Sequence, residues 1–92
     1  MKIPSRIQVK NEVYEVVYQE TIDDPEDIGY CDDEKKTLYI KLGLGKELTQ
    51  DVLAHELLHS ITHQYKIKIK HSELDKLATA LVEVCKLNGW IK

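Results

Sequence analysis

The chain has little cysteine, no long apolar run and no excess of positive charge, and each shortage excludes a class of protein. Its two cysteines, Cys31 and Cys85, lie far apart without a CxxC pair, which is too few for a disulfide framework. No window approaches the roughly 18 apolar residues of a membrane span, and residues 1–10 hold no apolar core of signal-peptide length. We therefore expect a cytoplasmic protein that keeps its thiols reduced and makes no membrane contact.

The charge balance argues against nucleic acid as a partner. With 13 Lys and Arg against 16 Asp and Glu, the formal charge is −3, so no overall basic field attracts DNA or RNA. The length of 92 residues predicts one domain, spanning residues 1–92. A domain of this size buries only about 60–65% of the surface of its unfolded chain, so a bound metal ion would add useful stability.

The most informative stretch is HELLH at positions 55–59, inside a run of helix formers from about residue 48 to residue 65. In a helix, His55 and His59 differ by about 40° around the axis and about 6 Å along it, so both imidazoles project from one face and can share one zinc ion. Glu56 lies between them, close enough to take a proton from a water on that metal. The alternative is a surface helix with two solvated histidines. The adjoining apolar stripe, which includes Leu57 and Ile61, favours a half-buried helix instead.

The remaining pattern predicts a small sheet before this helix. Residues 6–10 and 13–18 are rich in β-branched and aromatic side chains, and they predict an antiparallel hairpin. Residues 29–31 and 37–42 flank a charged turn and predict a second hairpin. The acidic residues 23–27, which include a proline, predict a loop between the two hairpins.

A second helix is predicted after the HExxH helix. Residues 66–70 alternate lysine with isoleucine, which suits an extended connection, and residues 72–75 have the pattern of a capping box. Asn88 and Gly89 are expected to end the helix. We therefore expect an α+β fold, with a small antiparallel sheet of three or four strands packed against the HExxH helix and a second, C-terminal helix.

A catalytic zinc ion usually has three protein ligands and one open position, so a third ligand is needed. His63 follows His55 by eight residues, about 12 Å along a straight helix, and cannot reach the same ion. The metzincin pattern requires Gly and His where this chain has Thr62 and Tyr65, so that class is excluded.

Three candidates for the third ligand lie near the first turn of the second helix, namely His71, Glu73 and Asp75. We expect Glu73, because a carboxylate completes a His, His, Glu set that zinc accepts. Asp75 is then placed to orient a ligand histidine from outside the coordination sphere. The alternative, with His71 or Asp75 as the ligand and Glu73 stabilising the helix N-terminus, remains open.

Residues 29–88 resemble small gluzincin-type metallopeptidases of the ImmA/IrrE-like and SprT-like kind, found in bacteria, phages and mobile elements. The matching segments are residues 29–32, 37–40 and 55–61, and Glu73 followed by Leu77 and Ala78. The resemblance implies that His55, His59 and Glu73 bind Zn²⁺ and that Glu56 is the general base. It also implies a protein or peptide substrate, which could be a regulatory protein.

The sequence therefore predicts a zinc-dependent metallopeptidase in which Glu56 acts as general base on zinc-bound water. If residues 37–42 form an edge strand, they would hold an extended substrate by strand addition. The alternative is a zinc-stabilised interaction module that binds a protein partner without cutting it. Glu56 separates the two hypotheses, because a purely structural zinc site has no use for a base.

Overall fold

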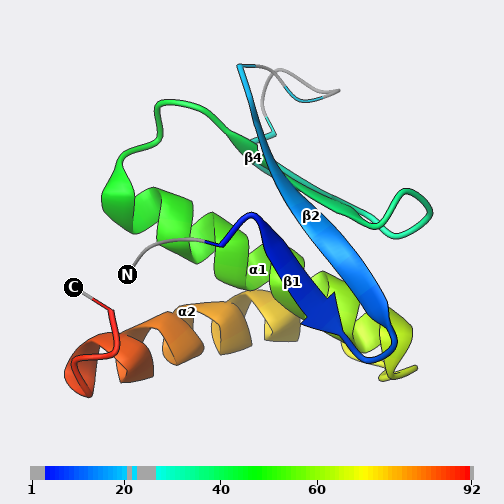
Figure 1. The fold of residues 1–92 in the computed structure, drawn as a ribbon. Coiled ribbons are helices and arrows are strands. Elements are labelled where there is room, and N and C mark those ends of the chain that lie inside the picture. The colour runs from blue at the N-terminus through cyan, green and yellow to red at the C-terminus, as the bar shows by residue number, and fades with distance from the viewer. Residues whose placement is uncertain (1–3, 21, 23–26, 92) are drawn as a thin grey trace.

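A computed structural model describes residues 4–20, 22 and 27–91 of the 92-residue chain, and it has the expected α+β fold, a four-stranded sheet with two helices (Figure 1). The elements in chain order are β1 Arg6–Val9, β2 Glu12–Gln19, β3 Gly29–Asp32, β4 Thr37–Lys41, α1 Lys46–Gln64 and α2 His71–Leu87. Of the acidic segment expected to form a loop, only Asp27 lies among the described residues. Neither helix combines the length and the apolar character that a membrane crossing requires.

The sheet is mixed, which corrects the expectation of a wholly antiparallel one. Both expected hairpins are present and antiparallel, but the strand order is β1-β2-β4-β3, and β2 pairs with β4 in parallel. The reason is that β3 starts at the end of the sheet where β2 finishes. There the backbone N–H of Leu42 donates to the carbonyl of Gln19, and that of Lys41 donates to the carbonyl of Ile28. The chain therefore runs back along β3, and β4 then follows the direction of β2.

The central place of β4 follows from its side chains. Leu38 and Ile40 are fully buried, whereas Tyr30 of β3 is 44% exposed. Burying an aliphatic side chain of this size contributes about 1.5–3 kcal/mol, so the more apolar strand is favoured inside the sheet. β4, which would have held a substrate only if it formed an edge strand, is therefore internal, and β3 is the edge strand next to it.

α1 is buried on two sides, because it lies between the sheet and α2 (Figure 1). The core between the sheet and α1 consists of Val9, Tyr14, Val16, Leu38, Ile40, Val52 and Leu53. The core between α1 and α2 consists of Ala54, Ala78, Val82 and Ile91. Among the described elements, α2 contacts only α1. The packing of α2 on α1 therefore determines which side chains of the first turn of α2 face α1.

The ends of α2 confirm one expectation and correct another. Asn88 is the C-cap, and Gly89 follows with a φ of 72°, as the sequence predicts. The expected capping box is not formed, because the N-cap is Lys70 and no side chain makes a capping hydrogen bond. Asp75, which was expected to close that box, turns instead toward His55 of α1.

Candidate metal centre

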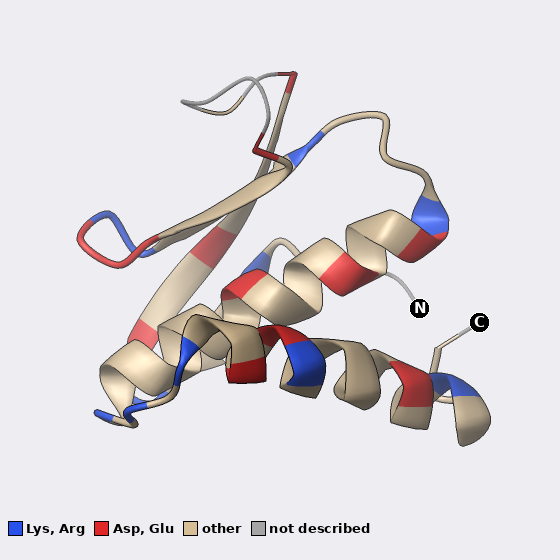
Figure 2. Ribbon diagram, turned by 180° about the vertical axis from the view of Figure 1, so that it is seen from behind, with Lys and Arg blue, Asp and Glu red and all other residues tan. Residues whose placement is uncertain are grey.

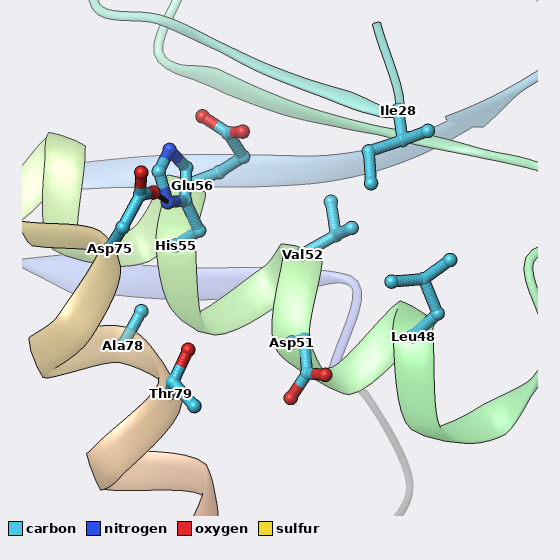
Figure 3. Close-up of a pocket in the computed structure, with 9 residues that line it drawn as sticks. All are labelled: Ile28, Leu48, Asp51, Val52, His55, Glu56, Asp75, Ala78 and Thr79. Atoms are coloured by element: carbon cyan, nitrogen blue, oxygen red, sulfur yellow. Dashed lines mark ion pairs between the residues drawn. The ribbon is translucent and has the colours of Figure 1, made fainter. Parts of the chain in front are cut away.

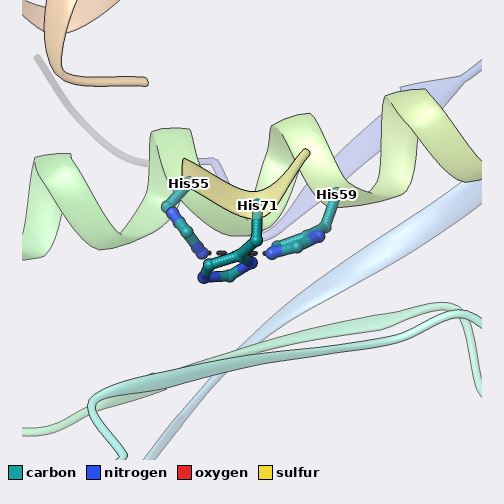
Figure 4. Close-up of side chains that lie close together, drawn as sticks. All are labelled: His55, His59 and His71. Carbon is teal, nitrogen blue, oxygen red and sulfur yellow. Dashed lines mark hydrogen bonds between the residues drawn. The ribbon is translucent and has the colours of Figure 1, made fainter. Parts of the chain in front are cut away.

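The two histidines of the HExxH motif project from the same face of α1, as helical geometry predicts (Figure 4). Their Nε2 atoms lie 3.1 Å apart and form a hydrogen bond. Two nitrogen ligands at about 2.0–2.1 Å from a tetrahedral zinc ion are separated by about 3.3 Å, from the geometry of a tetrahedron. The two donor atoms are thus close to the spacing that one shared ion requires.

His71 joins them from the first residue of α2. Its ring centroid lies 5.1 Å from that of His55 and 5.3 Å from that of His59. Each of the three residues offers a nitrogen atom, and these atoms all lie within 4.8 Å of one another. Figure 4 shows the three rings converging from two different helices. The three histidines are therefore close enough to bind one metal ion.

Glu73, the third ligand expected from the sequence, is not in this group. Its side chain is exposed and lines a separate hollow with Lys68 and Lys70. Successive helical residues are about 100° apart, so a residue two positions after His71 points about 200° away from it. His71, left open as an alternative, occupies the place beside the HExxH histidines.

Asp75 holds one of the three histidines. Its Oδ1 lies 2.6 Å from Nδ1 of His55, and its Oδ2 lies 3.7 Å from Nε2 of His71. A carboxylate on Nδ1 fixes the ring orientation of a histidine and makes its Nε2 a better metal ligand. The outer role that the sequence suggested for Asp75 therefore matches its position.

Burial favours the neutral, metal-binding form of the motif histidines. Loss of solvent lowers the pKa of His55, an effect that His71 reinforces and Asp75 opposes. Loss of solvent also lowers the pKa of His59, with further lowering by His55 and His71. Because only a neutral imidazole offers a lone pair, both residues are available to a cation at neutral pH.

Glu56 lies beside this group on the side of α1 that faces β3. It is only 7% exposed. Burial and, to a smaller extent, the negative charges of Asp27 and Asp75 together raise the pKa of its carboxyl to about 7. A carboxyl whose pKa lies near the working pH can both accept and release a proton, which is what a general base that later acts as an acid requires.

Gly29 lets β3 approach Glu56 closely. A Cβ atom at this position would lie 2.9 Å from Oε2 of Glu56 and would overlap Cγ1 of Val52. Contacts of this length force one of the neighbours to move, and Val52 has a stiff, β-branched side chain. The absence of a side chain at position 29 is therefore a condition for the packing of β3 on α1.

We expect Gly29→Ala to destabilise the protein by about 1–3 kcal/mol, the usual cost of overpacking a core. Urea unfolding of the metal-free protein measures this. Val52→Ala removes the methyl groups that the new side chain would meet. The double variant Gly29→Ala/Val52→Ala should therefore lose less stability than the sum of the losses in the two single variants. Equal stability of Gly29→Ala and the wild type would contradict the close approach.

A second polar group, which the sequence did not indicate, lies at the other end of β3. The buried Tyr14 donates a hydrogen bond of 2.7 Å from its hydroxyl to Oδ1 of Asp33 and accepts one of 3.0 Å from Nε2 of Gln64. Nδ1 of His63 lies 3.6 Å from Oδ2 of Asp33. Burial raises the pKa of Tyr14 to about 12, so it stays a donor. These contacts fasten the β3–β4 turn to the last turn of α1, and His63 belongs to them and not to the histidine group.

A cleft of about 290 Å³ adjoins the centre and is lined in part by His55, Glu56 and Asp75 (Figure 3). It opens between the start of β3, the first half of α1 and the first half of α2. A group bound in this cleft would therefore lie next to both the histidines and the buried carboxyl.

Comparison of the chain with protein-family models, with curated proteins and with solved structures gives no match. The features that point to a function are therefore the geometry of the centre and of the cleft beside it.

Proposed function

We propose that the protein is a zinc-dependent metallopeptidase that hydrolyses a peptide bond in a protein substrate. One observation carries the proposal: three convergent histidines lie beside a buried glutamate whose pKa is raised to about 7. A site that only stabilises a fold needs the histidines but gains nothing from burying a carboxyl there. A hydrolytic site needs both.

The donor set supports zinc as the metal. Three imidazole nitrogens and an open fourth position form a known catalytic zinc environment, and zinc accepts nitrogen ligands without a strong geometric demand. In this proposal His55, His59 and His71 hold the ion, with His71 in the place that the sequence analysis gave to Glu73. When bound, zinc supplies Lewis acidity, which polarises a carbonyl and acidifies water.

The protein residues then divide the remaining work. Glu56 takes the proton of the attacking water and delivers it to the leaving amine. Asp75 keeps the ring of His55 oriented through the 2.6 Å contact to Nδ1. Burial of Glu56 beneath Gly29 keeps its carboxyl from being stabilised by bulk water, which is why it remains basic enough for this task.

The edge of the sheet supports an extended peptide as the substrate. β3 pairs with β4 on one side and has no strand on its other side among the described residues. Gly29, at the start of β3, lies against Glu56. A peptide that added to this edge would pass the face of α1 that carries the histidines, so β3 takes the role considered for β4.

The proposal agrees with the resemblance to gluzincin-type metallopeptidases in the HExxH helix and differs from it in the third ligand. It also fits the cytoplasm predicted from the sequence, since Cys31 and Cys85 are both free. The substrate would be an extended segment of a protein, and a regulatory protein of the host cell or of a mobile element would meet that requirement.

The test is elemental analysis of untagged protein, followed by incubation of the zinc-loaded protein with a library of unstructured peptides. We expect about one zinc per chain and cleavage that stops when a chelator removes the metal. Bound zinc without cleavage of any peptide would point to the interaction module instead. A wild-type protein that takes up no zinc even on reconstitution would refute both functions.

A further inference from the structure

The cleft beside the histidines has apolar walls along most of its length. Ile28, Leu48 and Val52 contribute aliphatic side chains on the side of α1 that faces the start of β3 (Figure 3). Asp51 and Thr79 contribute the polar groups on the side that faces α2. The cleft thus offers an aliphatic surface next to a single carboxylate that the proposed reaction does not use.

Among the residues that the structure describes, Asp51 has no partner of opposite charge. It is half-buried, and no described lysine, arginine or histidine nitrogen lies within 4.0 Å of its carboxylate. It precedes His55 by one helical turn, about 6 Å along the axis of α1. That distance is about the length of a lysine side chain from its Cα to its amino group, since four methylenes separate the two ends.

The surroundings of Asp51 carry an excess of negative charge. Within α1 the only lysine or arginine is Lys46, the first residue of the helix (Figure 2). Lys76 of α2 does not line the cleft; it lines an adjoining hollow, which includes Glu83 and shares Asp75 and Thr79 with the cleft. The residues that line the cleft include three carboxyl side chains, Asp51, Glu56 and Asp75, and no lysine or arginine. A cation that enters the cleft would therefore meet carboxyl groups and no lysine or arginine side chain of the lining.

We propose that this cleft is a subsite for a lysine or arginine side chain of the substrate, with its aliphatic stem on Ile28 and Val52 and its cationic end at Asp51. The subsite rests on the proposed function, because the cleft would hold the substrate residue next to the bond that is cut. It narrows the substrate class to segments with a basic residue beside the scissile bond.

The test uses two capped amino acids that differ mainly in charge, N-acetyl-lysine methylamide and N-acetyl-norleucine methylamide. Each is titrated into zinc-loaded protein, and the amide resonances of Val52 and Thr79 report binding in the cleft. We expect the wild type to bind the lysine compound about fivefold more tightly, as one partly shielded ion pair allows. Asp51→Asn should bring the ratio close to one, whereas Glu83→Gln, which removes a charge outside the cleft, should preserve it.

Equal binding of the two compounds to the wild type would overturn the subsite. So would a lysine preference that survives in Asp51→Asn, or the absence of shifts at Val52 and Thr79 up to the solubility limit of the lysine compound. These results do not depend on hydrolysis. If the protein prefers the lysine compound but cleaves no peptide of the library, the subsite is retained and the metallopeptidase is refuted. If it cleaves peptides but shows no lysine preference, the metallopeptidase is retained and the subsite is refuted.

Discussion

Glu56→Gln is expected to lower peptide hydrolysis by about 10³-fold while the protein still binds one zinc ion per chain. Glutamine has nearly the shape of glutamate but cannot accept a proton, and loss of a general base typically costs 10²–10⁴-fold in rate. Zinc content should persist, because Glu56 is not in the group of three histidines. The measurement is the rate of cleavage of the best library peptide, with metal analysis of the same samples.

The same change should make the metal-free protein more stable at alkaline pH. Burial raises the pKa of Glu56 from 4.5 to about 7 in the folded protein. Between these values the folded state holds a proton that the unfolded chain has lost, so this group reduces the free energy of unfolding as the pH rises from about 4.5 to 7. Well above pH 7 the loss is complete, and replacing Glu56 by glutamine should recover about 3 kcal/mol.

Urea unfolding in the presence of a chelator, at pH 8 and again at pH 4, checks this difference. At pH 4 the carboxyl is protonated in both states, and the advantage of the variant should largely disappear. Glu83→Gln changes an exposed carboxylate on α2 and should shift stability by less than about 0.5 kcal/mol at either pH. A Glu56→Gln protein that keeps most of its activity would contradict the role of Glu56 as general base. A variant that is less stable than the wild type at pH 8 would contradict the raised pKa of the buried carboxyl.

His71→Ala is expected to weaken zinc binding by at least about 100-fold, whereas Glu73→Ala should change it by less than about threefold. Removing a direct ligand costs more than removing an outer carboxylate, for which 10–100-fold losses are usual. The two residues are both exposed and sit two positions apart on the first turn of α2, so each variant should fold. Competition with a chromogenic chelator measures both affinities.

The comparison distinguishes the candidates for the third ligand. A large loss in Glu73→Ala with little change in His71→Ala would restore the ligand expected from the sequence. Little change in either variant would leave Asp75, which lies within 4 Å of both His55 and His71. A circular dichroism spectrum like that of the wild type shows that a lost affinity does not come from unfolding.

The HExxH helix could be predicted because it depends on local geometry. Residues four positions apart on a helix share a face whatever the rest of the chain does, so the positions of His55 and His59 relative to each other follow from the sequence. The two hairpins are also local, since each joins neighbouring strands through a short turn. These features needed no knowledge of the tertiary fold.

The position of His71 could have been inferred from the apolar stripe of α2. Leu74, Ala78 and Val82 are its buried residues, and they mark the face that packs on α1. On a helical projection His71 lies about 20° from the centre of this stripe and Glu73 lies about 140° from it. Glu73 was expected because of ligand preference and family resemblance, and neither of these takes the periodicity of α2 into account.

By itself the sequence determined the local elements, which are the HExxH helix, the second helix and the two hairpins. Only the tertiary structure decided how these elements meet. The packing of α2 on α1 brought His71 to the motif histidines and Asp75 to His55. The order of the sheet placed β4 inside and β3 at the edge beside Glu56. Both outcomes depend on contacts between residues distant in the chain, whose free energies compete across the whole core, so no single segment contains enough information to fix them.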